Sequence, residues 1–224
     1  RFENEGDLEG AGAYDQTTLS PKFGVLYQPI ADKLSVFANY QNSFNNVGPA
    51  LVGDPNDGPQ TLKSFDPEQA NQLEFGFKTN LFYNRLNATV SYYDITVSDK
   101  VMADPDNPFN QIQAGEVTSS GFEIEINANP VAGLNFRGGY TNNESEVIET
   151  DNDNQLGTRP LEAGPKELYN FWATYEIQNG ALTGIGFGFG INGSSERAVL
   201  NYANTGTFML PKYTIGNASV YYQL

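Results

Sequence analysis

The stretch from Ser64 to Ile95 decides the fold, and it reads SFDPEQANQLEFGFKTNLFYNRLNATVSYYDI. From Leu73 to Lys78 every second residue is apolar, and the residues between are polar or glycine. The same alternation returns from Leu86 to Tyr92, after a tight turn at Tyr83–Asn84. Strict alternation indicates a strand with one apolar face, and two such runs across a short turn indicate a β-hairpin. What covers the apolar face therefore decides the class of protein.

The composition excludes several kinds of functional site. The 224 residues contain neither cysteine nor histidine, which excludes disulfide frameworks, Cys/His zinc sites and Ser-His catalytic triads from this chain. A net charge of −15 argues against a nucleic-acid partner, because binding phosphates requires basic patches. No apolar run reaches the length of about 18 residues that a transmembrane helix needs.

Alternating runs separated by turn-forming residues predict nine strands. We expect them at residues 20–28, 34–44, 70–81 and 85–99, then in a run ending near 127, at 134–147, at 166–178, in a run beginning at 185, and at 210–224. The first 18 residues are acidic, glycine-rich and without periodicity, so we interpret them as a loop. Residues 45–67, 100–111, 148–165 and 196–209 are interpreted as long loops on the same grounds.

The connections between these runs alternate between short and long. In an antiparallel meander, alternate connections lie at opposite ends of the sheet, so the short turns would share one end and the long loops the other. Outer-membrane β-barrels are built in this way, whereas a soluble Greek-key sandwich gives no reason for such alternation. We therefore predict an all-β fold, an antiparallel up-and-down transmembrane β-barrel segment. Two packed sheets with Greek-key crossovers would contradict this prediction.

Several short motifs resemble the outer barrel of TonB-dependent outer-membrane receptors, particularly siderophore receptors. They are FDPE at 65–68, LEFGFKT at 73–79, YDIT at 93–96, GFEIE at 121–125 and LPKYT at 210–214. The order and spacing of these motifs carry the resemblance, which runs from about residue 20 to residue 224.

The resemblance implies that the chain is part of a larger barrel. Plugged outer-membrane transporters have about 22 strands, so nine strands would be a fragment from the C-terminal half of the barrel. Residues 1–19 are then expected to be an extracellular loop. Residues 20–224 would form a partial β-barrel domain with short periplasmic turns and long extracellular loops. The plug domain of the family is expected to lie outside this chain.

The implied function belongs to the parent protein, TonB-dependent active transport of ferric siderophores across the outer membrane of a Gram-negative bacterium. Outer loops and the plug would capture the ferric siderophore, the TonB complex would act through the plug, and outer-membrane lipid would surround the wall. We expect no enzymatic activity, no cofactor and no nucleic-acid partner. Receptors for cobalamin, heme or a glycan are alternatives within transport, and a secreted adhesin or lectin-like β-sandwich is the alternative from another class.

Five aromatic and arginine side chains in or beside the predicted outer loops are candidates for ligand contact. Receptors of this kind often hold iron chelates with such side chains, because aromatic rings supply apolar area and arginine supplies fixed charge and donors. The candidates are Phe44, Phe109, Arg159, Arg197 and Tyr202. The alternative for each is an ordinary loop residue. No catalytic or metal-binding residue is predicted.

Other polar or glycine-rich runs receive structural interpretations. Residues 104–107 and 151–154 carry oxygen ligands suited to calcium, but neither run matches an EF-hand loop, so we interpret both as solvated acidic loops. Glu123 and Glu125 are expected to line a wet lumen rather than to act as an acid/base pair. The G-x-G-x-G run at 186–190 is not a nucleotide fingerprint, because no helix is predicted after it. Its small residues are expected to leave room for the plug.

Overall fold

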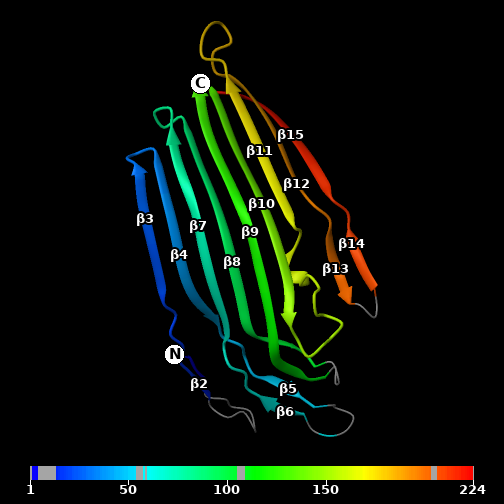
Figure 1. Cartoon of the computed structure of the whole chain (residues 1–224). Helices are drawn as coiled ribbons and strands as arrows, with labels where there is room; N and C mark the ends of the chain where they lie inside the picture. The colour runs from blue at the N-terminus through cyan, green and yellow to red at the C-terminus, as the bar shows by residue number, and fades with distance from the viewer. Residues whose placement is uncertain are drawn as a thin grey trace.

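The computed structural model describes residues 2–4, 14–53, 58, 60–104, 109–202 and 206–223. Nine strands form its main sheet (Figure 1). They are β3 (Lys22–Ile30), β4 (Leu34–Asn45), β7 (Glu68–Leu81), β8 (Leu86–Ala103), β9 (Gln111–Val131), β10 (Leu134–Glu149), β11 (Glu167–Glu176), β12 (Ile185–Ser194) and β15 (Tyr213–Tyr222). The strand order is β15-β12-β11-β10-β9-β8-β7-β4-β3, and every neighbouring pair is antiparallel.

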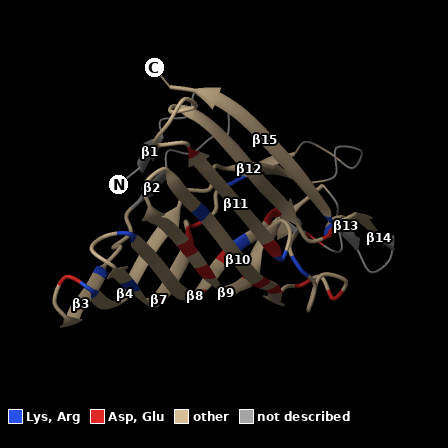
Figure 2. Cartoon of the chain, turned by 90° about the horizontal axis from the view of Figure 1, so that it is seen from above, with Lys and Arg blue, Asp and Glu red and all other residues tan. Residues whose placement is uncertain are grey.

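The up-and-down topology predicted from the sequence is therefore confirmed. Each inner strand of the main sheet pairs with the main-sheet strands before and after it in the chain, and the remaining sheets of the described residues have two strands each. The sheet is curved, as the view from above shows (Figure 2). This arrangement contradicts the β-sandwich alternative, which needs a second large sheet packed on the first.

Three segments interpreted as loops contain short hairpins instead. β1 (Phe2–Asn4) pairs with β2 (Tyr14–Gln16), β5 (Ala50–Val52) with β6 (Thr61–Lys63), and β13 (Arg197–Tyr202) with β14 (Gly206–Leu210). A single-turn 3-10 helix, η1 (Leu161–Ala163), lies between β10 and β11. Strands of three to six residues are too short to show a clear period in the sequence, which is why these elements were missed.

The connections lie at the predicted ends of the sheet, but the long ones and the short ones differ less in length than the sequence predicts. Those of the β3–β4, β7–β8, β9–β10 and β11–β12 pairs gather at one end of the sheet, here called the short-turn end (Figure 1). The β4–β7, β8–β9, β10–β11 and β12–β15 connections gather at the other, the loop end. The expected loop at 100–111 shrinks to 104–110, no longer than the turn at 177–184, because β8 and β9 continue to pair up to Ala103 and Gln111.

The cross-strand register separates an apolar face from a polar one. Phe77 pairs with Val90, and Val90 pairs with Ile124, so these residues share one face. Cross-strand partners extend this apolar face over the other strands. It carries Phe75, Phe77, Val90, Ile124, Phe171, Phe187 and Phe189. Aromatic pairs stabilise it, including Phe75 with Tyr92 at 5.2 Å and Phe122 with Tyr140 at 5.6 Å between ring centroids.

The apolar face is largely exposed in this chain. Phe75 and Phe189 are 50% and 56% exposed, although side chains of this kind are usually buried in water-soluble proteins. Among the described residues, the buried hydrophobic side chains are Phe65, Val117 and Val147. The sheet therefore has no closed hydrophobic core of its own, and its apolar face needs an apolar surrounding. Among the described residues, no helix is long and apolar enough to cross a membrane.

The glycine run of β12 makes room for aromatic rings of neighbouring strands. A Cβ atom on Gly190 would lie 2.0 Å from the Trp172 ring, and one on Gly186 would lie 2.1 Å from the Tyr221 ring. Trp172 and Tyr221 come from β11 and β15, on either side of β12. The expectation that these small residues leave room for a plug is thus corrected, because the rings occupy the space above them.

Candidate functional site

The polar face carries a hydrogen-bonded cluster near the loop end of the sheet. We call it the Asn143 cluster, after the residue at its centre, and it consists of Tyr93, Ser119, Asn143, Ser145 and Arg159. Register explains why four of these meet, since Tyr93 pairs with Gly121, Gly121 with Asn143, and Ser119 with Ser145. The fifth, Arg159, reaches the cluster from the β10–β11 connection.

Gly121 is the residue that allows the cluster to form. A Cβ atom at this position would lie 2.0 Å from the Asn142 carbonyl oxygen and 2.8 Å from the Tyr93 hydroxyl. The absence of a side chain lets Tyr93 reach across β9, where its hydroxyl oxygen accepts a hydrogen bond from Asn143 Nδ2 at 2.8 Å. The glycine of the GFEIE motif is therefore needed for a structural reason, the close approach of Tyr93 and of the β10 backbone.

The side chain of Asn143 is fully engaged by its neighbours. Its Nδ2 also donates to Ser119 Oγ at 2.7 Å, and its Oδ1 accepts from Ser145 Oγ at 2.8 Å. Arg159 Nη2 donates to the same Oδ1 at 2.7 Å. Ser145 is buried, with 9% of its surface exposed, and buried polar groups are stabilised only when they find partners of this kind.

Arg159 fastens the β10–β11 connection onto the sheet. Its Nη1 donates to the Asn143 carbonyl at 2.9 Å, and its Nε donates to the Gly164 carbonyl at 3.0 Å. Nη2 also donates to the carbonyls of Ala163 and Pro165, at 3.2 and 3.3 Å. Burial lowers the pKa of the Arg159 guanidinium below its ordinary value, while the nearby Glu144 carboxylate raises it. The charge persists at neutral pH, because an arginine pKa lies far above 7.

Two further contacts hold the same connection. Backbone hydrogen bonds join Val147 to Thr158 and Gly157, at 3.0 and 2.9 Å. Lys100, near the end of β8, forms an ion pair with Glu162 in η1. Burial raises the pKa of Glu162, but the hydrogen bond and the charge of Lys100 outweigh it and hold this pKa below its ordinary value. The connection is thus folded back over the polar face.

The other candidate residues lie apart from Arg159. Phe44 is in β4 and has the register of the apolar face, opposite Gln69. Phe109 lies in the β8–β9 connection and is 44% exposed. Arg197 begins β13 and is exposed, and Tyr202 ends the same strand. The sequence analysis gave the positions of these residues along the chain, but only the register shows that Phe44 belongs to a different face.

The loop-end connections form two groups. Gly53, next to β5, donates its N–H to Asn110 Oδ1 at 2.6 Å, and Gln113 exchanges hydrogen bonds with the Asp66 backbone at 2.6 and 2.9 Å. These bonds join the β5–β6 hairpin to the connection that carries Phe109. On the other side, β13 contacts η1, which brings the hairpin of Arg197 beside the connection that Arg159 fastens.

The polar face continues from these loops toward the short-turn end. Glu123 and Glu125 are exposed on it, and their partners on β8 are Ser91 and Thr89. An open pocket of about 480 Å³ lies here, with Glu74, Lys78 and Glu123 among its lining residues. The described residues contain no group of three or more His, Cys, Asp or Glu side chains that could hold a metal ion.

Sequence reasoning missed Tyr93, Asn143 and their serine partners. The available signal was small, because Asn, Ser and Tyr on the polar side of a strand are ordinary residues for a solvated face.

The two acidic runs at 104–107 and 151–154 are the segments interpreted as solvated loops. Residues 105–107 of the first lie outside the described residues. In the second, Asn152 Oδ1 accepts a hydrogen bond from the Asn154 N–H at 3.1 Å, so its side chain shapes the turn.

Comparison with known proteins finds similar proteins whose matches extend over most or all of the chain. The family model for the β-barrel of TonB dependent receptor-like proteins matches residues 1–224. The metal-pseudopaline receptor CntO of Pseudomonas aeruginosa is 32% identical over 225 residues, which cover 100% of this chain and 30% of that protein. The ferrichrome outer membrane transporter/phage receptor of Escherichia coli is 32% identical over 71% of this chain and 21% of its own length.

A solved structure has the same fold. The siderophore receptor PiuA from Acinetobacter baumannii matches with a TM-score of 0.76 and 23% identity, over 97% of this chain and 32% of that one. The chain therefore spans about a fifth to a third of the length of the proteins it resembles.

Proposed function

The chain belongs to the TonB-dependent receptor family, whose members lie in the outer membrane, and from that premise we propose that it forms part of the wall and outer loops of a transporter for ferric siderophores. The observation that carries this proposal is the match along the whole chain to receptors of metal–chelate ligands, 32% identical over 100% of the chain for CntO. The names of the relatives describe receptors and transporters rather than enzymes.

The two faces of the sheet fit this role. Lipid would cover the apolar face, since a transmembrane barrel carries an outward apolar band. The polar face, with Glu123, Glu125 and the Asn143 cluster, would line the lumen and meet the plug. The loop end would then be extracellular and the short-turn end periplasmic, as is usual for outer-membrane barrels. The TonB complex would act on the plug from the periplasm.

Ligand capture would take place at the loop end. Arg197 and Tyr202 lie on a hairpin beside η1, and Phe109 lies on the other group of connections. Aromatic rings and an arginine at such positions can contact an anionic metal chelate. Arg159 would act as a positioning residue, because all three nitrogens of its guanidinium donate to the loop or to Asn143. Phe44 has the register of the apolar face. It would therefore contact a ligand only at the outer rim of the barrel, where the strand extends past the lipid.

An uptake assay tests the proposal. A host that lacks its own siderophore receptors would express the full receptor containing this barrel, and uptake of ⁵⁵Fe would be measured with a panel of siderophores. We expect uptake of at least one ferric siderophore that stops when TonB is removed. Uptake of cobalamin or heme instead, or iron uptake that does not depend on TonB, would contradict the proposal.

A second ligand class is supported by the CntO match. CntO is a receptor for metal–pseudopaline, so a small metallophore carrying another transition metal is the alternative ligand. Repeating the assay with ⁶⁵Zn or ⁶³Ni and a metallophore of that type distinguishes the two. TonB-dependent uptake of zinc or nickel without any ferric siderophore uptake would favour the alternative.

A further inference from the structure

The β7–β8 turn at the short-turn end has an unusual backbone. Phe82, Tyr83 and Asn84 follow one another with φ of 55°, 59° and 67°, a left-handed conformation that bulky side chains rarely adopt. Both aromatic side chains of this turn are exposed, Phe82 to 69% and Tyr83 to 99%. Exposed aromatic rings at the end of a membrane strand are typical of the membrane–water interface.

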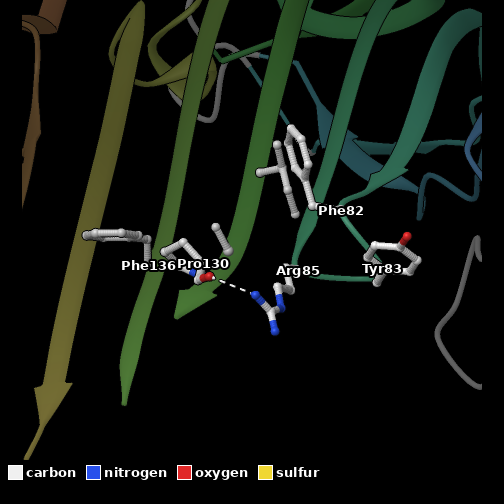
Figure 3. A pocket seen from close by; sticks show the side chains of 7 residues that line it. Phe82, Tyr83, Arg85, Pro130 and Phe136 are labelled. Atoms are coloured by element: carbon white, nitrogen blue, oxygen red, sulfur yellow. Dashed lines mark hydrogen bonds between the residues drawn. The ribbon is translucent and has the colours of Figure 1, made fainter. Parts of the chain in front are cut away.

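An open pocket of about 580 Å³ lies beside this turn (Figure 3). Leu86, Ala128, Pro130 and Phe136 line it together with the aromatic turn residues. Leu86 and Phe136 are both cross-strand partners of Ala128, which has the register of Ile124. The pocket therefore opens on the apolar face and continues the surface that we assign to lipid.

Among the described residues that line the pocket, Arg85 carries the charge. Its Nη1 donates to the Pro130 carbonyl at 3.3 Å, as the dashed line in Figure 3 marks. Arg85 is exposed, and within the described part of the chain it forms no ion pair with an acidic side chain. Arg85 thus places a positive charge on the rim of an apolar pocket, where it can pair with an anion from outside the chain.

We propose that this pocket binds one anionic phospholipid of the periplasmic leaflet, with its phosphate at Arg85 and an acyl chain in the pocket. The planar guanidinium of arginine matches the geometry of a phosphate. The apolar lining matches an acyl chain, and the exposed rings of Phe82 and Tyr83 match the headgroup level. This inference rests on the orientation given under the proposed function, with the short-turn end in the periplasm, but not on the transported ligand.

Native mass spectrometry of the full receptor, released from a neutral detergent, tests this site. The probes are palmitoyl-oleoyl phosphatidylglycerol, phosphatidylcholine with the same chains, and glycerophosphoglycerol, which has the headgroup without chains. We expect one phosphatidylglycerol to bind at least about five times more tightly than phosphatidylcholine, in line with about 1 kcal/mol per basic residue near an anionic lipid. Glycerophosphoglycerol should not displace it.

Two variants locate the binding. Arg85→Gln should remove the preference for phosphatidylglycerol. The matched control Arg137→Gln should keep it, because Arg137 pairs with Asn127 on the polar face and carries the same charge. Ala128→Leu, which fills the pocket, should weaken both lipids.

Three outcomes of the lipid-binding measurement would each overturn the proposal. These are equal binding of the two lipids by the unsubstituted receptor, an unchanged preference in Arg85→Gln, or the same loss in Arg137→Gln. Siderophore uptake is measured in parallel on the same variants. Failure of lipid selectivity with intact uptake would refute this site alone, and selective lipid binding without uptake would refute the transport proposal alone.

Discussion

Single glycines decide where the large side chains of the polar face can lie. Gly121 lets Tyr93 reach Asn143, and Gly190 lets the Trp172 ring cross β12. The sequence analysis recognised the alternation around Gly190 but attributed the small residues to a plug. A glycine in a strand indicates that something approaches closely, but the sequence does not say whether the approaching group is a neighbouring ring or another domain.

The guanidinium of Arg159 supports a first prediction about loop order. Substitution Arg159→Gln leaves the carbonyls of Asn143, Gly164 and Pro165 without this donor, and each unsatisfied buried group costs about 1–3 kcal/mol. We expect faster amide hydrogen exchange across residues 157–166 of the full receptor. The control Arg197→Gln removes the same charge from an exposed residue of the neighbouring hairpin. Unchanged exchange in Arg159→Gln would show that other contacts hold this connection.

The ion pair of Lys100 with Glu162 predicts a dependence on pH. The pKa of Glu162 is lowered in the folded protein, so the stabilisation is present above the ordinary glutamate pKa of about 4.3. It is lost as the pH falls through the lower pKa of the folded state. A nitroxide at Leu156, in the same connection, should therefore become more mobile below about pH 4, and much less so in Glu162→Gln. Identical pH profiles in both proteins would rule out this pair as the cause.

Strands with a clear period were predictable, and irregular elements were not. The alternation from Leu73 to Tyr92 places β7 and β8 almost as observed, because a face covered by one kind of environment selects one kind of side chain. The strands of the β13–β14 hairpin are too short to show a period, and the inward fold of the β10–β11 connection depends on contacts between segments distant in sequence. No local pattern reports such contacts, which is also why the Asn143 cluster was not predicted.

The two faces of β12 predict different costs for the same new charge. Phe189→Arg places a guanidinium on the apolar face and should destabilise the receptor by about 2–4 kcal/mol near the bilayer midplane. Asn192→Arg places it on the polar face, where Asn192 pairs with Asn170 and Ile215, and should cost less. Urea titrations of refolding into lipid vesicles measure both values. Equal and small costs at the two positions would contradict a lipid-covered apolar face.

The chain as a whole presents two unpaired sheet edges. Within the described residues, β3 and β15 each pair on one side only, and open edges are costly in hydrocarbon and promote aggregation in water. Together with the exposed apolar face, this predicts that residues 1–224 expressed alone will not form a soluble monomer. Analytical ultracentrifugation in detergent-free buffer provides the measurement. A monodisperse monomer with cooperative thermal unfolding would contradict both the fragment and the membrane interpretation.

The central claim is that one face of this sheet meets lipid and the other lines the lumen of an outer-membrane receptor. This chain contributes no cysteine, so once any cysteine elsewhere in the full receptor is replaced, single nitroxide labels can be introduced one at a time from position 122 to position 127 of β9. Collisions with lipid-soluble oxygen would be measured by electron paramagnetic resonance in the full receptor, embedded in outer-membrane lipid. The account predicts high oxygen accessibility at Phe122, Ile124 and Ile126, and low accessibility at Glu123, Glu125 and Asn127. Accessibility without this period of two, or the opposite alternation, would contradict it.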